Sequence, residues 1–90
     1  MVDVRVPAPL RAHTQGAKLV KGEGGTVGEV LDDLDRRFPG IKAGLFDASG
    51  ELRQFVNVYV NDEDIRYLGR LKAEVGPGDT VSILPAVAGG

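Results

Sequence analysis

A single segment of this 90-residue chain has the spacing of an amphipathic helix, and strand-like segments lie on both sides of it. Thr26 and Glu29 have the T-x-x-E spacing of a capping box, in which each side chain accepts a hydrogen bond from a backbone N–H at the helix start. Pro39 disfavours helical geometry in Phe38 and ends the segment. The predicted apolar face consists of Val27, Val30, Leu31, Leu34 and Phe38. Two acid–arginine pairs have the i,i+4 spacing of helical ion pairs, and these are Asp32–Arg36 and Asp33–Arg37.

Alternation of apolar and polar residues predicts the strands. The predicted strands are residues 2–6, 17–20, 55–60 and 80–84. Glycine, proline and acidic residues predict a loop at 21–25 and turns at 47–51, 61–64 and 76–79. We interpret residues 41–54 as a loop held down by Ile41, Leu45 and Phe46. Short packed pieces are expected at Ile65, Leu68 and Leu71.

This order of elements predicts an α+β fold. A helix between the second and third strands supplies the crossover that a mixed sheet needs. We therefore predict a β-grasp (ubiquitin-like) roll, with a mixed four- to five-stranded sheet packed on one main helix. Residues 1–84 would form this domain, and residues 85–90 would form a flexible C-terminal tail that ends in Gly-Gly.

Composition excludes several classes of function. The net charge is −2, with 13 acidic and 11 basic residues spread along the chain, so no basic stripe indicates nucleic-acid binding. No run approaches the roughly 18 apolar residues of a membrane span. The N-terminus lacks a cationic flank followed by an apolar core, so we expect no secretory signal and a cytoplasmic protein.

The sequence does not assemble a catalytic or metal site. It contains no cysteine, and its one histidine, His13, lies in a predicted loop. The glycines at 22–25 lack the spacing of a phosphate-binding loop, and the acidic turn at 61–64 lacks the spacing of an EF-hand. We expect a protein that is not an enzyme and that binds no cofactor or metal itself.

The C-terminal "ILPAVAGG" is the segment with the clearest functional interpretation. Pro85 keeps Leu84 extended and cannot donate to a sheet, so the last strand should end there. Val87 and Ala88 are small, and Gly89 and Gly90 lack a Cβ, so this peptide would fit a channel too narrow for other residues. The alternative is an ordinary frayed terminus.

The segment "FVNVYVNDEDIRYLGRLKAEVGPGDTVSILPAVAGG" resembles the ThiS/MoaD family of sulfur-carrier proteins, and within it the cysteine-biosynthesis carriers of actinobacteria. The resemblance is most specific in V-N-D-E-D, Gly78-Asp79 and the tail. It implies that an E1-like enzyme adenylates Gly90 with ATP and converts it to a thiocarboxylate, with Gly89, Ala88 and Val87 giving access. The sulfur would pass to a cysteine synthase-like or thiosugar synthase-like enzyme, and a metal-dependent peptidase would release new cysteine. Thiamin thiazole and a molybdopterin precursor are the alternative acceptors.

Large side chains near the tail predict a docking patch for these partners. If Val56, Val58 and Val60 face the helix, then Phe55 and Tyr59 lie on the opposite sheet face together with Leu84. The alternative is that the 41–54 loop or the tail covers them. Three other functions stay open: a ubiquitin-like conjugation tag, an interaction module with an idle tail, and a synthase subunit whose tail is permanently inserted in a partner.

Overall fold

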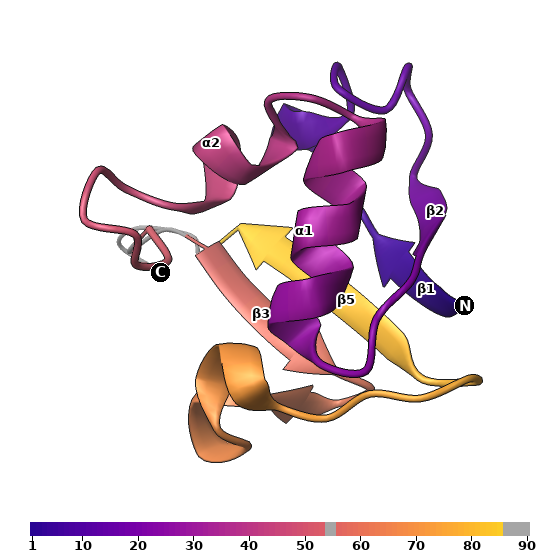
Figure 1. Cartoon of the computed structure of the whole chain (residues 1–90). Coiled ribbons are helices and arrows are strands. Elements are labelled where there is room, and N and C mark those ends of the chain that lie inside the picture. Colours follow the sequence, from indigo (N-terminus) through magenta and orange to yellow (C-terminus); the bar gives the residue numbers. More distant parts are fainter. Residues whose placement is uncertain (54–55, 86–90) are drawn as a thin grey trace.

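The computed structural model describes residues 1–53 and 56–85, and within these residues five strands form one mixed sheet in the order β2-β1-β5-β3-β4 (Figure 1). β1 is parallel to β5, and the other neighbouring pairs are antiparallel. The strands are β1 (Val2–Arg5), β2 (Leu19–Gly22), β3 (Val56–Val60), β4 (Glu63–Asp64) and β5 (Thr80–Pro85). The helical elements are η1 (Ala8–Leu10), α1 (Val27–Arg37), α2 (Ile41–Leu45), η2 (Ile65–Tyr67) and η3 (Arg70–Lys72). The predicted β-grasp fold is confirmed.

The main helix, α1, begins at the predicted cap. The Thr26 hydroxyl accepts a hydrogen bond from the Glu29 N–H at 3.2 Å. The Glu29 carboxylate in turn accepts from the Gly25 N–H at 2.8 Å, so both side chains accept from backbone donors at the helix start as predicted. The last turn ends where the Phe38 N–H donates to the Leu34 carbonyl, one residue before Pro39. Two donors of the helix start are therefore satisfied, as a capping box requires, with the second shifted by one residue.

Ion pairing along α1 confirms one predicted pair and corrects the other. Asp33 and Arg37 approach to 3.1 Å. Arg36, however, pairs with Asp33, and Asp32 pairs with Lys42 of α2. Asp33 is only 3% exposed, and an unpaired buried carboxylate would be costly, so the ion pairs with both arginines compensate its charge.

The core lies between α1 and the inner face of the sheet. α1 contributes four fully buried side chains, at Val27, Val30, Leu31 and Leu34. The sheet contributes the alternating valines and isoleucine of three strands: Val2, Val4, Val58, Val60, Val81 and Ile83. Each fully buried aliphatic side chain stabilises the fold by about 1.5–3 kcal/mol.

Five boundaries differ from the predictions, and the first is that of β1, which ends at Arg5 instead of at residue 6. β2 covers residues 19–22 instead of 17–20, and α2 lies inside the predicted 41–54 loop. β4 occupies the second half of the predicted 61–64 turn, and β5 includes Pro85. β1 pairs with β5 only over Thr80–Ser82, so Pro85 has a neighbouring strand on the β3 side alone, as in an edge strand, where proline is tolerated.

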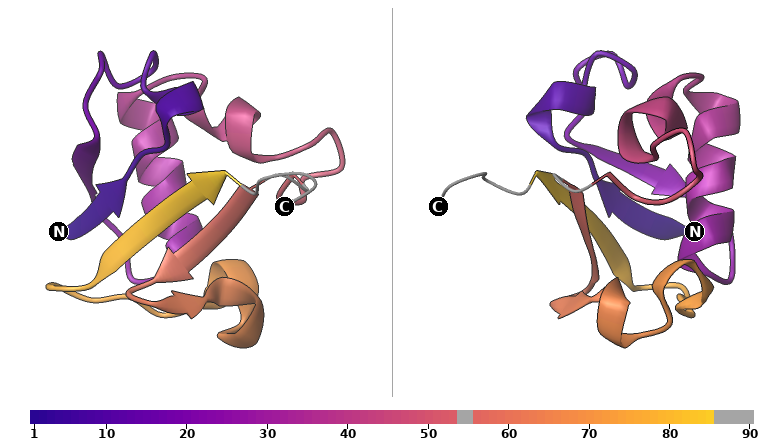
Figure 2. Two further views of the ribbon diagram at one scale, coloured as in Figure 1. Left: turned by 180° about the vertical axis from the view of Figure 1, so that it is seen from behind. Right: turned by 90° about the vertical axis from the view of Figure 1, so that its left-hand side faces the viewer.

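The two faces of the sheet have different surroundings. α1 and α2 lie on one face (Figure 1), and Figure 2 shows from behind that no helix of the described residues crosses β1, β5 and β3 on the other. We call this second surface the outer face. The alternation that buries Val58 and Ile83 places Tyr59 and Leu84 on it.

Candidate functional site

The root of the C-terminal tail is defined by strand pairing. Pro85 is opposite Val56 of β3, and Leu84 is opposite Asn57. β5 is a central strand, with β1 on one side and β3 on the other. The site residues predicted at Val87, Ala88, Gly89 and Gly90 lie outside the described residues, and so does Phe55. The described part of the chain therefore places the residues that directly precede the predicted tail.

Two predicted docking residues lie on the outer face near this root. Leu84 is 46% exposed, whereas Tyr59 is half-buried. Tyr59 is opposite Ser82, so it lies two residues along β3 from Asn57, the partner of Leu84. We call Tyr59 and Leu84 the tail-root patch. Their predicted face is confirmed, and their role in docking stays a prediction.

Arg66, which sequence analysis missed, joins β4 to the strand beside the tail root. Its guanidinium donates to the Asn57 side-chain oxygen at 3.2 Å and to the Asp64 carboxylate at 2.8 Å. The hydrogen bond from Arg66 lowers the pKa of Asp64, and the Asp64 carboxylate raises the pKa of Arg66. The spacing of Asp64 and Arg66 in the sequence could have indicated their ion pair. The contact between Arg66 and Asn57 could not be read from the sequence, because it forms only when the chain folds.

Two more exposed apolar side chains lie at the end of η2 and directly after it. Tyr67 is 86% exposed and Leu68 is 37% exposed. Both follow Arg66 directly in the chain. Sequence analysis treated this segment as a packed piece, which holds for Ile65 at 1% exposure but not for its neighbours.

The motif residues Asn61 and Asp79 form a clasp between the β3–β4 turn and the start of β5. The Asn61 side chain donates to Asp79 at 3.2 Å and accepts from the Thr80 N–H at 3.1 Å. The Gly76 N–H donates to Asp79, and this bond is the main cause of its lowered pKa. Asn61 has φ 57°, a left-handed conformation that asparagine tolerates better than most residues. The motif therefore has a structural role in aligning β3 with β5.

No metal or membrane site is formed by the residues that the structure describes. Within residues 1–53 and 56–85, no group of three or more His, Cys, Asp or Glu side chains is placed to hold a metal ion. None of the helices in these ranges is long and apolar enough to cross a bilayer. His13 lies against Gly40, beside α2 and away from the tail root.

Comparison of the sequence with known proteins identifies the family of this chain. The model of the ThiS family matches residues 4–90. The chain belongs to the ThiS family. It is 50% identical over 91 residues to the sulfur carrier protein CysO of Mycobacterium tuberculosis (strain ATCC 25618 / H37Rv), and the match covers 99% of this chain and 98% of that protein.

Solved structures of ThiS-like proteins have the same fold. The crystal structure of the BexX/CysO complex of Amycolatopsis orientalis contains a chain with 54% identity, a TM-score of 0.91 and full coverage of both chains. The small archaeal modifier protein 1 of Methanosarcina acetivorans is 32% identical, with a TM-score of 0.81, 99% coverage of this chain and 95% coverage of that one. Proteins with this architecture thus include some named as carriers and some named as modifiers.

Proposed function

We propose that this protein is a sulfur carrier and that the carboxylate of Gly90 is its working group. The observation that supports this most directly is the tail root: β5 ends at Pro85 beside the exposed tail-root patch, and the family match extends to residue 90. A carrier needs a rigid domain for recognition and a slender segment that reaches a partner's active site. Residues 86–90 could extend at most roughly 17 Å beyond Pro85.

The chemistry follows from the properties of a carboxylate, which is a poor electrophile. An E1-like enzyme would bind ATP, and an oxygen of Gly90 would attack the α-phosphorus and expel pyrophosphate. Sulfide would then attack the carbonyl carbon of the mixed anhydride, release AMP and leave a thiocarboxylate. The carboxylate must approach the phosphorus in line, which Gly89 permits because it adds no side chain to the channel.

We place the carrier in cysteine biosynthesis, because the sulfur carrier protein to which it is 50% identical over nearly the full length is a CysO protein. The partners would be an E1-like adenylyltransferase and sulfurtransferase, a sulfur-accepting synthase and a metal-dependent peptidase. CysO of Amycolatopsis orientalis forms a complex with BexX, so delivery to a different acceptor enzyme is a specific alternative. ATP would be bound by the activating enzyme and not by this chain.

Intact mass spectrometry tests the proposal. Incubation with the activating enzyme, ATP and sulfide should raise the mass by the exchange of one oxygen for one sulfur. Adding one alanine after Gly90 should abolish this gain with no change in the thermal unfolding midpoint, because the fold does not involve the added residue. The matched control adds one alanine before Met1 and should react normally. A chain extended at Gly90 that still gains sulfur would contradict the role of the Gly90 carboxylate, and absence of the gain in the unextended chain would favour an interaction module.

A conjugation tag is the second candidate, and the similarity to a small archaeal modifier protein favours it. In that function the activated Gly90 would be transferred to a lysine amine. The same reaction, with lysine-containing proteins present, would then produce adducts of higher mass that resist thiols. The carrier function predicts a thiocarboxylate without such adducts.

A further inference from the structure

A groove of about 670 Å³ lies at the β3 edge of the sheet, between residues 50–53 and the η2–η3 segment. Figure 1 shows both segments beyond β3, on the same edge of the molecule. Part of the groove lining is apolar and half-buried, at Leu52, Val56 and Leu71. Half-buried apolar side chains in a groove can still bury area against a partner.

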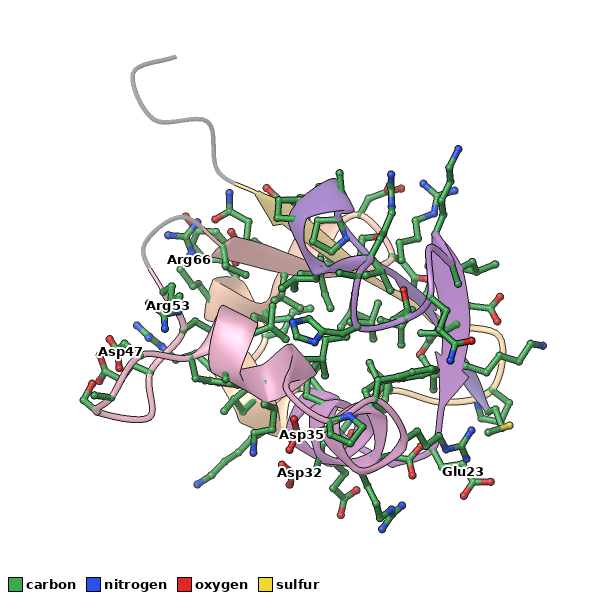
Figure 3. The ribbon with its side chains drawn as sticks, turned by 90° about the horizontal axis from the view of Figure 1, so that it is seen from above. Glu23, Asp32, Asp35, Asp47, Arg53 and Arg66 are labelled. Atoms are coloured by element: carbon green, nitrogen blue, oxygen red, sulfur yellow. The ribbon has the colours of Figure 1, made fainter. Side chains whose placement is uncertain are left out.

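Among the charged residues of the lining, cations outnumber acids. Four exposed cations line the groove, at Arg53, Arg66, Arg70 and Lys72, against two acids, Glu51 and Asp64. Figure 3 shows Arg53 and Arg66 on one side of the molecule, away from Glu23, Asp32 and Asp35. The whole chain has a net charge of −2, so this groove concentrates positive charge on an acidic protein.

Arg70 and Lys72 are the cations that a partner would meet unpaired. Arg66 is neutralised by Asp64, and Arg53 donates to the Ala43 carbonyl. Among the described residues, neither Arg70 nor Lys72 forms an ion pair. Arg70 follows Gly69, which has φ 101°, and itself has φ 59°, a costly conformation for a residue other than glycine.

The groove also adjoins the tail root. Val56 lines the groove and is the strand partner of Pro85. A protein that receives the tail would therefore lie close to the groove. The occupant should combine carboxylates with apolar side chains, because the lining combines cations with apolar surface.

We propose that this groove binds an extended acidic and apolar segment of the partner that receives the tail, an inference that rests on the proposed carrier function. Carboxylates of the segment contact Arg70 and Lys72, and its apolar side chains cover Val56 and Leu71. This contact is separate from the chemistry of Gly90. It gives the partner a second point of recognition that orients the domain before the tail enters.

A binding experiment on the full chain tests the proposal. The probe is a blocked hexapeptide that alternates glutamate and leucine, observed through the backbone amide resonances of the isotopically labelled protein. We expect saturable shifts at Val56, Gly69 and Leu71. A glutamate–serine peptide of equal charge should bind several-fold more weakly, since it cannot cover the apolar lining, and a lysine–leucine peptide should not bind.

Two double variants with the same change in charge separate the groove from general attraction. R70E/K72E should weaken binding of the glutamate–leucine peptide by about tenfold, since two attractive charge pairs become repulsive. R5E/K18E changes exposed cations on or beside β1 and β2 and should leave the affinity within about twofold. Equal losses in both variants would overturn the proposal, because the attraction would then depend on net charge alone.

Three other results of the binding experiment would overturn the proposal for the groove. Equal affinity for the leucine and serine peptides, or the same shifts with inorganic phosphate, would show a simple anion site and overturn the proposal. Absence of saturable binding would overturn it as well. A chain ending at Pro85 should bind the peptide normally although it cannot carry sulfur, so failure of the groove and failure of the carrier function are distinguishable.

Discussion

At the scale of single residues, Asp33 is a buried charge that the fold neutralises. It is 3% exposed and accepts the Glu23 N–H at 2.9 Å, and it pairs with Arg36 and Arg37. The Glu23 hydrogen bond, followed by the two arginines, lowers the pKa of Asp33 despite its burial. A lowered folded pKa contributes stability that is present above the unfolded pKa and is lost as the pH falls through the folded value.

We predict that D33N lowers the thermal unfolding midpoint at neutral pH by roughly 5 °C, since asparagine keeps an acceptor but loses the charge. The difference from the wild type should shrink as the pH falls below about 4, the ordinary pKa of an unfolded aspartate, and should be lost once the pH has fallen through the lowered pKa of folded Asp33. Thermal unfolding at neutral and acidic pH measures both effects. D32N is the matched control, because Asp32 lies one residue away and its side chain is 66% exposed. A difference that stays constant with pH would contradict this account of Asp33.

At the scale of elements, the packing of α1 on β2 depends on a glycine. A Cβ at Gly22 would lie 2.9 Å from the Val30 Cγ1 and 3.4 Å from the Val30 carbonyl oxygen. Valine is restricted to one rotamer in a helix, so Val30 cannot turn away. Gly22 therefore lets β2 pass close under the helix, which explains why the strand continues into a segment that its glycines predicted to be a loop.

We predict that G22A destabilises the protein by about 1–3 kcal/mol through overpacking. The sign of this change in stability is informative, because glycine-to-alanine changes at positions with room for a Cβ usually stabilise a protein by about 0.4–1 kcal/mol. Chemical denaturation measures the change in the free energy of unfolding. G76A is the control, since a Cβ at Gly76 would meet nothing within 4 Å, and it should be neutral or slightly stabilising. Equal stability of G22A and the wild type would show that the close approach is not required.

The elements differ in how well the sequence predicts them. The alternation of β1, β3 and β5 and the cap of α1 are local patterns, so their type and inward faces were predicted correctly. α2 has five residues and begins after Gly40 in a left-handed conformation, which provides too short a pattern to recognise. β4 consists of two residues and exists through its pairing with Tyr59 and Val60. The groove is lined by residues 50–53 and by residues between 64 and 72. These segments are separate in the sequence and meet only in the folded chain, so the groove could not be predicted.

At the scale of the whole molecule, the surfaces are divided by the sheet. The helices α1 and α2 cover one face (Figures 1 and 2). The tail-root patch lies on the outer face, and the groove lies beside β3. The patch and the groove both adjoin Val56 and Asn57, which pair with Pro85 and Leu84. A partner that holds the tail can therefore contact both surfaces without disturbing the core.

The outer face offers a matched test of docking, because Leu84 and Leu19 are both exposed leucines, at 46% and 52%. Leu84 is on β5 at the tail root, whereas Leu19 is on β2 at the far edge of the sheet.

We predict that L84T lowers kcat/KM for thiocarboxylate formation by about tenfold, as expected for the loss of an apolar docking contact. The rate at saturating carrier should be unchanged, since docking acts equally on the ground state and the transition state. Threonine suits a strand, so the thermal midpoint should change little. L19T should react like the wild type, and an equal loss in L19T, or none in L84T, would show that the tail-root patch does not dock the activating enzyme.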